Sequence, residues 1–444
     1  MENFGCRATQ ADGAAIERQL AEKGLVRSDD PNAAQVVVLN TCTVTASADQ
    51  DARASIRRIH RQNPEARILV TGCYAQRAPE EIAALPGVSL VVGNSHKHQL
   101  AEIALPTANT FVPLSAIAHA DGAPAMVGDI FAHTELLAAP VFDSDHEKTR
   151  PNLKVQDGCN NRCSFCIIPF VRGRSRSLKL DEVIANVDRL VANGYREIVL
   201  SGINLGRWGR DFGSDKRYRF ADLLREILDR TSFAKLRISS VEPMDWSDDL
   251  ISLVASSDRI CRHAHVPLQS GSDRILRKMH RKYRPWHYED RIAKIRAAMP
   301  TAAIGADVMV GFPGETDEDF EQTRSFIERL PFTYLHVFTY SSRPGTASSE
   351  MADQVPVHLA RERNKVLREL VARKKFEFQQ QFIGETLEAI TLTHQQNGRT
   401  EALTDNYQKL WIEGAIAPNQ SVTATINAIE GEALLGSVAP TRAS

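Results

Sequence analysis

The chain of 444 residues has no long apolar run and few cysteines. No stretch approaches the ~18 consecutive apolar residues that a membrane helix needs. The polar N-terminus, interrupted by Cys6 and Arg7, does not have the pattern of a signal peptide. We therefore expect a cytoplasmic protein without a membrane partner. Its seven cysteines are an odd number in such a chain, which favours free, metal-binding or catalytic thiols over a disulfide framework.

The chain also has almost no net charge, −1, but this charge is unevenly distributed. Residues 1–149 carry −6, residues 150–384 carry +9 and residues 385–444 carry −4. A basic central segment suits a polyanion, because phosphate contacts dominate the affinity of proteins for RNA. The candidate basic groups, which could equally be solvated surface, are Arg172, Arg174 and Arg176, and then Arg277, Lys278, Arg281, Lys282 and Arg284.

Helical and strand patterns alternate over residues 1–104, which predicts βαβ units and a parallel sheet. The expected strands are short and rich in β-branched residues, at 36–39, 68–71 and 90–92. Only four residues precede Gly5, fewer than the ~5–6 of an ordinary strand, so we expect the natural chain to begin further upstream. Residues 105–149 carry scattered prolines and no sustained period, which predicts a linker.

Alternation resumes over residues 150–383 and predicts a partial or full (β/α) barrel. The six expected strands lie at 153–155, 197–200, 236–239, 265–266, 304–310 and 335–338. A helix rich in Lys, Arg and Glu is expected to close this unit at 358–382. Residues 384–444 then show short alternating strands, which predict a small β-barrel with turns at Asn397-Gly398, Glu413-Gly414 and Glu430-Gly431.

The strongest chemical signal is Cys159-x3-Cys163-x2-Cys166, on one loop directly after an expected barrel strand. Barrel enzymes place their active sites at this end of the strands. Three thiolates can hold three corners of a cubane iron–sulfur cluster and leave the fourth iron open. The alternative, a zinc knuckle, normally needs a fourth ligand, and no Cys or His follows within roughly ninety residues.

A second set, Cys6, Cys42 and Cys73, repeats one placement, at or just after the end of an expected strand. The carboxyl ends of parallel strands share one edge of a sheet, where ligands bind. A single cysteine after a strand is most often a packing residue. Three with the same placement are better explained by a shared site, again with an open iron.

The first triad, with Phe165 before its last cysteine, resembles the radical S-adenosylmethionine (SAM) superfamily. This resemblance implies that the open iron chelates SAM and that cluster reduction cleaves SAM to a 5′-deoxyadenosyl radical. It places Phe165 near the SAM adenine. Ser201-Gly202-Ile203-Asn204 departs from the usual Gly-Gly-Glu that holds the SAM amine, and here we expect contacts from Gly202 and Glu242. The chemistry belongs to the cofactor, so no catalytic side chain is assigned.

With the second triad included, nearly the whole chain is similar to the methylthiotransferase family. The matching segments are Asn40-Thr41-Cys42-Thr43-Val44-Thr45, Gln156-Asp157-Gly158-Cys159, 265–272, 311–316 and 340–346. The C-terminal strands, with Leu403-Thr404-Asp405-Asn406-Tyr407, resemble the RNA-binding TRAM domain. The resemblance implies SAM and two 4Fe-4S clusters, one at Cys159, Cys163 and Cys166 for radical generation, and one at Cys6, Cys42 and Cys73 for sulfur delivery.

Within this family, Thr43-Val44-Thr45 most resembles the branch that acts on threonylcarbamoyladenosine next to the anticodon of tRNA, at adenosine 37. Other branches methylthiolate isopentenyladenosine in tRNA or an aspartate of a ribosomal protein. The resemblance implies a tRNA substrate and an electron donor such as a flavodoxin or ferredoxin, and we expect a monomer. A non-enzyme alternative is an RNA-binding module with structural zinc in both cysteine sets.

The roles of five further residues are not decided by the sequence. Cys261 matches no motif and is expected to be buried and structural. His263 and His265 have a metal-like spacing, although hydrogen-bonded core histidines are the commoner case. Tyr407 and Trp411 are candidates for stacking on RNA bases or for the core of the small barrel.

Overall fold

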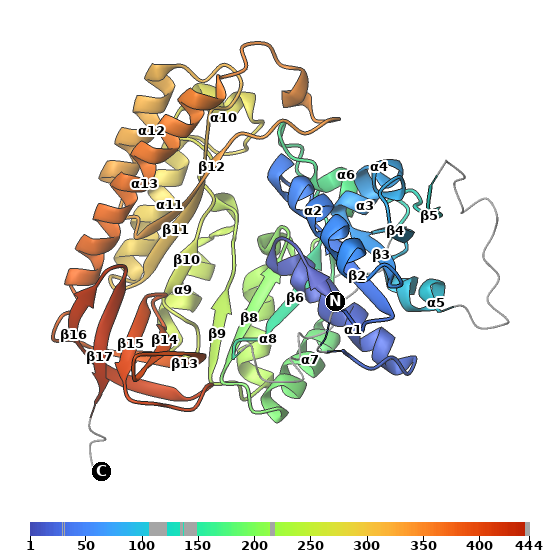
Figure 1. Cartoon of the computed structure of the whole chain (residues 1–444). Helices are drawn as coiled ribbons and strands as arrows, with labels where there is room; N and C mark the ends of the chain where they lie inside the picture. Colours follow the sequence, from blue (N-terminus) through green and yellow to red (C-terminus); the bar gives the residue numbers. More distant parts are fainter. Residues whose placement is uncertain are drawn as a thin grey trace.

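The computed structural model describes residues 1–28, 30, 32–105, 122–133, 136, 149–213 and 218–439. Figure 1 shows a parallel N-terminal sheet, a central group of strands and helices, and a C-terminal barrel at the far side of the central group. The predicted mixed α/β class is thereby confirmed. Most of the expected linker 105–149 lies outside the described residues. No helix in the described ranges is long and apolar enough to span a bilayer.

The N-terminal sheet has the strand order β1-β2-β3-β4-β5, and all its neighbours are parallel. Its strands span Glu2–Asn3 (β1), Val36–Thr41 (β2), Arg67–Gly72 (β3), Val88–Gly93 (β4) and Ala125–Met126 (β5). The last strand falls inside the segment expected to be a linker. The middle strands are buried on both faces, as continuous runs of β-branched residues predict.

Helices cover this sheet, and one of them, α2, starts at a side-chain cap. They are α1 (Arg7–Glu22), α2 (Ala46–Gln62), α3 (Cys73–Arg77), α4 (Pro79–Ala83), the short 3-10 turn η1 (Lys97–Gln99) and α5 (Leu100–Ala104). The side chain of Thr45 accepts a hydrogen bond from the backbone of Ala48 and so caps α2. Thr45 belongs to the segment after Cys42 that carries the family resemblance. Its role as the N-cap of α2 explains structurally why a threonine stands at this position.

All six strands predicted for the central segment are present. Together with the short β7, which was not predicted, they form two sheets, β7-β6-β8-β9 and β10-β11-β12, which a bridge from Ser240 to His265 joins in parallel. The strands span Asn152–Asp157 (β6), Arg176–Ser177 (β7), Glu197–Gly202 (β8), Lys235–Ile238 (β9), His263–His265 (β10), Ala303–Val310 (β11) and Tyr334–Thr339 (β12). Because β6 and β12 are not neighbours in the described sheets, the barrel wall is partial.

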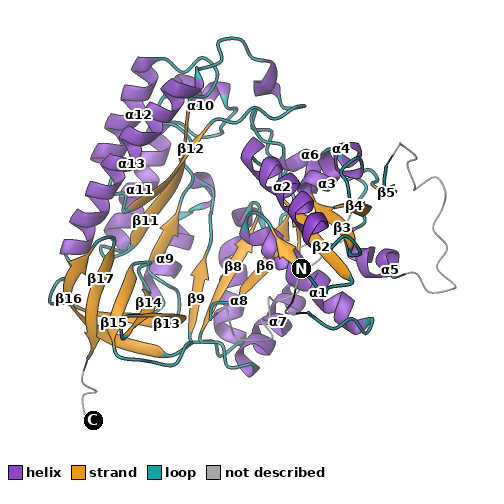
Figure 2. Cartoon of the chain, in the orientation of Figure 1, coloured by secondary structure: helices purple, strands orange, loops and turns teal. Residues whose placement is uncertain are grey.

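Helices alternate with these strands and cover the outside of the barrel wall (Figure 2). They span Ile168–Arg172 (α6), Leu180–Ala192 (α7), Phe220–Arg230 (α8), Asp248–Ser256 (α9), Asp273–Lys278 (α10), Pro285–Ala298 (α11), Asp317–Arg329 (α12) and Val357–Gln380 (α13), with 3-10 turns η3 (Leu205–Arg207), η4 (Pro243–Asp245) and η5 (Ala347–Glu350). Helix α9 was not predicted from the sequence. Helix α12 starts with a reciprocal capping box between Thr316 and Asp319.

The C-terminal strands close into a barrel of order β13-β14-β15-β17-β16. They span Thr386–Gln396 (β13), Arg399–Thr404 (β14), Lys409–Glu413 (β15), Ser421–Glu430 (β16) and Ala433–Val438 (β17). Asn397 and Gly398 both have positive φ, 52° and 71°, as the two central residues of a hairpin turn require. The small β-barrel predicted from the turn signals is therefore confirmed.

Candidate functional site

The register of the N-terminal sheet brings Cys42 and Cys73 together. Thr41 pairs with Gly72 in neighbouring strands, and each cysteine is the next residue of its chain. Gly72 has a φ of 102°, and a Cβ there would lie 2.3 Å from the carbonyl oxygen of Thr41. Only glycine fits this turn, which directs the chain from β3 into α3 at Cys73.

Cys6 reaches the same edge from β1. The backbone N–H of Phe4 donates to the carbonyl of Asn40 at 2.9 Å, which keeps the chain beside β2 up to this point. Gly5 follows, and a Cβ on it would lie 2.6 Å from the Cβ of Cys42. The three cysteines thus converge at one sheet edge, as the strand-end pattern predicts.

The three thiols of this N-terminal triad differ in exposure. Cys42 and Cys73 are buried, whereas Cys6 is exposed. Burial, and then the proximity of Cys73, raise the pKa of Cys42 to about 12. The side-chain amide of Asn94 donates to the sulfur of Cys73 at 3.5 Å. Buried, neighbouring thiols lose their protons only when positive charge lies near them. The irons of a cluster would supply this charge, so the residues fit such a group.

A buried network of charges joins α1 to the barrel strand β6 behind this triad. Arg172 donates to Asp12 and to Asp157, both at 3.0 Å, and Lys97 donates to Asp12 at 3.0 Å; Lys154 bonds both carboxylates. Burial by itself would raise the pKa of Asp12, but Lys154, Lys97 and Arg172 outweigh it and lower this pKa to about 2. Lys154, Arg172 and Arg176 likewise outweigh burial at Asp157 and hold the pKa of its carboxyl well below the ordinary value. Both carboxylates are therefore charged at neutral pH.

Two of the arginines considered as phosphate contacts are inside the protein. Arg172 is 2% exposed and bound to two aspartates. Arg281 is also buried, and its guanidinium bonds the carboxylate of Glu242 and the sulfur of Cys163. A phosphate contact is therefore wrong for Arg172, whose guanidinium is enclosed by two aspartates. Arg281 does line a cavity, but its guanidinium is already engaged by Glu242 and Cys163. A cluster of arginines and lysines in a sequence does not show which of these side chains have partners inside the protein.

Two sulfurs of the second triad, on the loop after β6, accept hydrogen bonds from neighbouring residues. The sulfur of Cys159 accepts hydrogen bonds from the backbone of Asn161 at 3.4 Å and from the side chain of Asn204 at 3.5 Å. The sulfur of Cys163 accepts one from Arg281 at 3.2 Å. Burial, and then the proximity of Cys163, raise the pKa of Cys166 to about 12. Hydrogen-bond donors at the sulfurs are the second-sphere contacts by which proteins tune iron–sulfur clusters.

A cavity of about 430 Å³ connects this loop with the exposed cysteine of the N-terminal triad. Its lining includes all three cysteines of the radical loop and, from the N-terminal sheet, Cys6 and Val44. The two triads therefore face a common space, although they belong to different sheets. This is an arrangement for two groups that act on one molecule held between them.

The residues predicted to contact SAM all line this cavity. They are Phe165, which packs edge-on against Phe312, Gly202 at the end of β8, and Glu242, which is bound to Arg281. Beside them, the hydroxyl of Ser201 and the amide oxygen of Asn204 are buried and have no hydrogen-bond partner among the residues that the structure describes. Unpaired buried acceptors are costly and would be satisfied by the amine of SAM, so the site fits this cofactor.

The zinc alternative differs from a cluster in where it would place the three thiolates. A single zinc would draw its thiolates together, since each Zn–S bond is only about 2.3 Å long. A cubane cluster instead attaches each thiolate to a different iron and spreads the sulfurs apart.

The barrel strands β10, β11 and β12 also contribute a wall of polar side chains to the cavity. The hydroxyl of Tyr334 lies 2.7 Å from Nε2 of His263 and 3.1 Å from Nδ1 of His265. Asp307 lies 3.2 Å from His265. The expectation of hydrogen-bonded histidines is therefore confirmed. Tyr334, Asp307 and also His336 were not predicted as site residues; polar side chains alternating along otherwise apolar barrel strands were the available signal.

The C-terminal barrel also contributes to this wall. The ring of Tyr407 lies 4.4 Å from that of His263 and 5.3 Å from that of Tyr334, and it lines the cavity. Trp411 instead packs against His394 and under the ammonium of Lys409. Cys261 is buried, as predicted, and bonds Glu197. Of the two aromatic candidates, Tyr407 is the one that belongs to the site.

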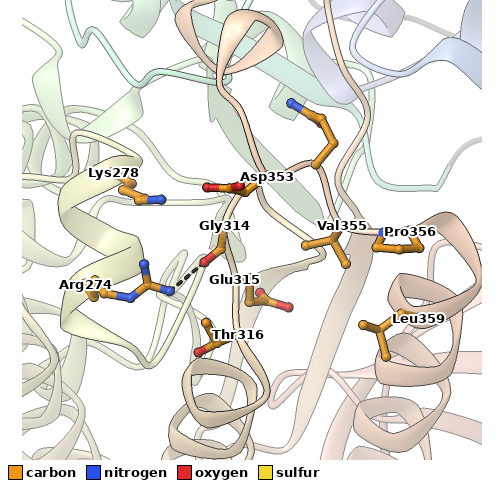
Figure 3. A pocket seen from close by; sticks show the side chains of 10 residues that line it. Arg274, Lys278, Gly314, Glu315, Thr316, Asp353, Val355, Pro356 and Leu359 are labelled. Carbon is orange, nitrogen blue, oxygen red and sulfur yellow. Dashed lines mark hydrogen bonds between the residues drawn. The ribbon is translucent and has the colours of Figure 1, made fainter.

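A separate cavity of about 380 Å³ lies between α10 and the loops before α12 and α13 (Figure 3). Arg274 crosses it and donates to the carbonyl of Gly314 at 2.5 Å. Lys278 and Asp353 also line it. It shares no lining residue with the cavity between the triads, and its charged groups are mixed in sign.

Comparison with known proteins agrees with this geometry. Residues 153–327 match the Radical SAM superfamily, and residues 1–93 match Uncharacterized protein family UPF0004. The threonylcarbamoyladenosine tRNA methylthiotransferase MtaB of Bacillus subtilis is 40% identical over 93% of this chain and 89% of its own. The chain belongs to the radical SAM methylthiotransferase family. The Aquifex aeolicus protein of the same name is 37% identical over 93% of this chain and 96% of its own.

The tRNA-2-methylthio-N(6)-dimethylallyladenosine synthase of Desulfitobacterium hafniense is 34% identical over 87% of this chain and 84% of its own. Among solved structures, the radical SAM methyltransferase TsrM from Kitasatospora setae has a TM-score of 0.54 at 17% identity, covering 75% of this methylthiotransferase and 70% of TsrM. This likeness shows a shared fold. The cofactors of a radical SAM methylthiotransferase are two 4Fe-4S clusters and SAM, which confirms the cofactors expected from the two triads.

Proposed function

We propose that this methylthiotransferase converts threonylcarbamoyladenosine, next to the anticodon of tRNA, to its 2-methylthio derivative. The observation that carries the proposal is the single cavity lined by Cys6 of one triad and by all three cysteines of the other. The choice of acceptor is supported by the relatives at 40% and 37% identity, whose names state this activity. The segment Thr43-Val44-Thr45 after Cys42 supports the same branch.

Each triad is assigned one cluster in this proposal. Cys159, Cys163 and Cys166 would hold the cluster that binds SAM, with Phe165, Gly202 and Glu242 around the SAM molecule. Cys6, Cys42 and Cys73 would hold the cluster that carries the transferred sulfur. When bound, SAM and the two clusters supply the radical, the methyl group and the sulfur. The cavity residues orient the acceptor and keep water away from it.

The cavity walls suit an adenine that has left the stack of the anticodon loop. Enzymes that modify a base take it out of its stack and hold it between aromatic or apolar side chains. Tyr334 and Tyr407 provide such rings on one side, with ring centroids 5.3 Å apart. On the other side lie the sulfur-bearing triad and Val44. The base would thus lie between the tyrosine rings and Cys6.

The remaining partners follow from the reaction. Reductive cleavage of SAM needs an external electron, so we propose a flavodoxin or ferredoxin as the donor. We further propose that the protein acts as a monomer, since one chain supplies both triads and the cavity between them. Because its proposed substrate is tRNA, the reaction is assigned to the cytoplasm.

The proposal is tested by mass spectrometry of tRNA nucleosides from a strain that lacks the gene. Loss of 2-methylthio-threonylcarbamoyladenosine, with accumulation of its unthiolated precursor, is expected. Loss of 2-methylthio-isopentenyladenosine instead would assign the protein to the other tRNA branch. Unchanged tRNA would overturn the RNA substrate and direct the search to ribosomal proteins with a missing methylthio group.

A further inference from the structure

Arg7 is the first residue of α1, directly after Cys6, and its side chain lines the cavity between the triads. It is half-buried, yet within the described part of the chain its guanidinium makes no hydrogen bond or ion pair. The other arginine of the cavity, Arg281, already bonds Glu242 and the sulfur of Cys163. Arg7 is therefore an unpaired positive charge at the sulfur-bearing end of the cavity.

The groups that face Arg7 do not supply an anion for it. Burial lowers the pKa of His263 and of His336, and the charge of Arg7 lowers both further, so these rings are neutral near pH 7. The carboxylate of Asp307 is already engaged by His265 at 3.2 Å. A half-buried guanidinium without a partner has a strong preference for an anionic ligand.

The position of Arg7 also fits the geometry of a substituted adenine. The C2 atom, which accepts the sulfur, and N6, which carries the substituent, lie on the same edge of the ring, one on either side of N1. A side chain that holds the N6 substituent must therefore lie beside the triad that delivers sulfur. Arg7 adjoins Cys6, the cysteine of that triad which lines the cavity.

We propose that Arg7 binds the carboxylate of the threonylcarbamoyl group and thereby selects this acceptor over a dimethylallyl one. This inference rests on the proposed function. The threonylcarbamoyl group ends in a free carboxylate, which arginine binds through two parallel hydrogen bonds. A dimethylallyl group is apolar and would leave the guanidinium desolvated and unpaired, which is how a polar site rejects an apolar analogue.

Two other anions share this chemistry, namely a phosphate of the RNA and the carboxylate of SAM. The experiment separates them with anticodon stem-loop RNAs that carry threonylcarbamoyladenosine, its methyl ester, or dimethylallyladenosine. Wild type, Arg7→Gln and Arg7→Lys are compared by kcat/KM for methylthiolation and by formation of 5′-deoxyadenosine. Arg18→Gln, which removes an exposed charge from the same helix, is the matched control.

Wild type is expected to prefer the acid over the ester by roughly 100-fold, the scale of a charged hydrogen-bonded pair. Arg7→Gln should lose about 100-fold on the acid and under about threefold on the ester, and Arg7→Lys should keep part of the preference. Arg18→Gln should match wild type. Iron content and unfolding temperature check that each variant is folded and loaded. Even if Arg7→Gln loads poorly, a wild-type acid preference below about threefold would overturn the proposal.

The other outcomes also decide the question. Equal losses by Arg7→Gln on acid and ester RNAs would assign Arg7 to a phosphate, and loss of 5′-deoxyadenosine formation without RNA would assign it to SAM; either overturns the proposal. Unchanged turnover of the acid RNA by Arg7→Gln would overturn it while leaving the proposed function intact. Wild-type turnover of the dimethylallyl RNA alone would overturn both.

Discussion

Cys42 and Cys159 each follow a strand end, but they belong to different triads, and their replacement should have different effects. Cys42→Ala is expected to leave reductive cleavage of SAM intact and to abolish methylthio transfer. Cys159→Ala is expected to abolish both, because the cluster that binds SAM loses a ligand. Parallel assays of 5′-deoxyadenosine and of modified RNA make the comparison. Loss of SAM cleavage in Cys42→Ala would contradict the division between the triads.

Asp12 neutralises three buried cations, so its charge matters more than that of a surface acid. Asp12→Asn would leave Lys154 and Arg172 with Asp157 as their remaining carboxylate partner. Within the described residues, Lys97 would keep only the amide oxygen of Asn40. Breaking a buried ion pair from one side costs about 3–5 kcal/mol, so we expect that loss in the free energy of unfolding. Urea unfolding under argon, followed by tryptophan fluorescence, measures it.

The control for Asp12→Asn lies on the same helix. Glu22→Gln breaks an exposed pair with Arg18 and should change the free energy of unfolding by less than about 1 kcal/mol. Equal losses in the two variants would show that burial of the network contributes nothing. The pKa of Asp12, lowered to about 2, keeps this carboxylate charged throughout the neutral range, so its contribution is present above its ordinary pKa and is lost only in acid.

At the scale of single residues, the cysteines were predictable and their neighbours were not. A cysteine at the end of each of three parallel strands already implies convergence, because strand ends share an edge. Arg7, Tyr334 and His336 carry no such signal, since they meet across elements whose packing the sequence does not reveal. The internal partners of Arg172 and Arg281 could not be predicted for the same reason. Their acidic partners lie up to 160 positions away.

At the scale of elements, the turn from β3 into α3 determines where Cys73 lies. Gly72→Ala would place a Cβ 2.3 Å from the Thr41 carbonyl, so the turn must shift and Cys73 with it. We expect iron to fall from about eight to about four atoms per chain, because one four-iron cluster loses a ligand. Iron analysis after anaerobic purification measures this change.

Gly24→Ala is the matched control for Gly72→Ala. Gly24 also has a positive φ, 86°, but a Cβ there meets nothing within 4 Å. This variant should therefore show backbone strain without loss of iron. If both variants kept full iron, the close approach at Gly72 would have no part in positioning Cys73.

The strands and long helices were predictable because their apolar patterns are local. The runs at β2, β3 and β4 follow from buried β-branched sequences, and the barrel strands follow from short apolar runs that alternate with helical patterns. Several short elements were not predicted, among them α9 and β5. Helix α9 spans nine residues, and β5 has only two, within a proline-bearing segment that resembles a linker. Helix α9 does have a local signal, because the side chain of Ser247 caps its N-terminus.

At the scale of the whole molecule, Arg237 fixes the C-terminal barrel to the central strands. This buried side chain of β9 donates to the carbonyls of Thr404 and Asp405, both at 3.0 Å, and to Glu197. Arg237→Met should loosen the barrel, and amide hydrogen exchange should become faster in β14 and β15 but not in β2 and β3. Exchange that rises equally in all four strands would contradict a local role.

Arg399→Met is the control for Arg237→Met, because it removes an exposed ion pair with Glu430 from the same barrel. We expect its exchange pattern to match that of wild type. The docking that Arg237 provides brings Tyr407 into the cavity, so exchange near β14 and the affinity for RNA should change together in Arg237→Met. A loosened barrel with unchanged RNA affinity would remove Tyr407 from the proposed binding wall.

Contacts between the N-terminal sheet and the central strands could not be predicted from local patterns. Arg343, from the loop after β12, donates to Asp49 at 2.7 Å and to the carbonyl of Thr43 at 3.3 Å. Both ends of this contact lie in or beside segments that carried the family resemblance. These segments are distant in sequence and come into contact because the carboxyl-end edges of the two sheets face each other.

The unequal exposure of the N-terminal triad has a consequence for the order of events in catalysis. Cys42 and Cys73 are buried, and Cys6, the exposed member, faces the cavity in which the acceptor would lie. Incoming sulfur and outgoing product would then both pass through the cavity beside Cys6. We expect the enzyme to be recharged only after the RNA has left, so that excess RNA slows multiple turnover while leaving the first turnover unaffected.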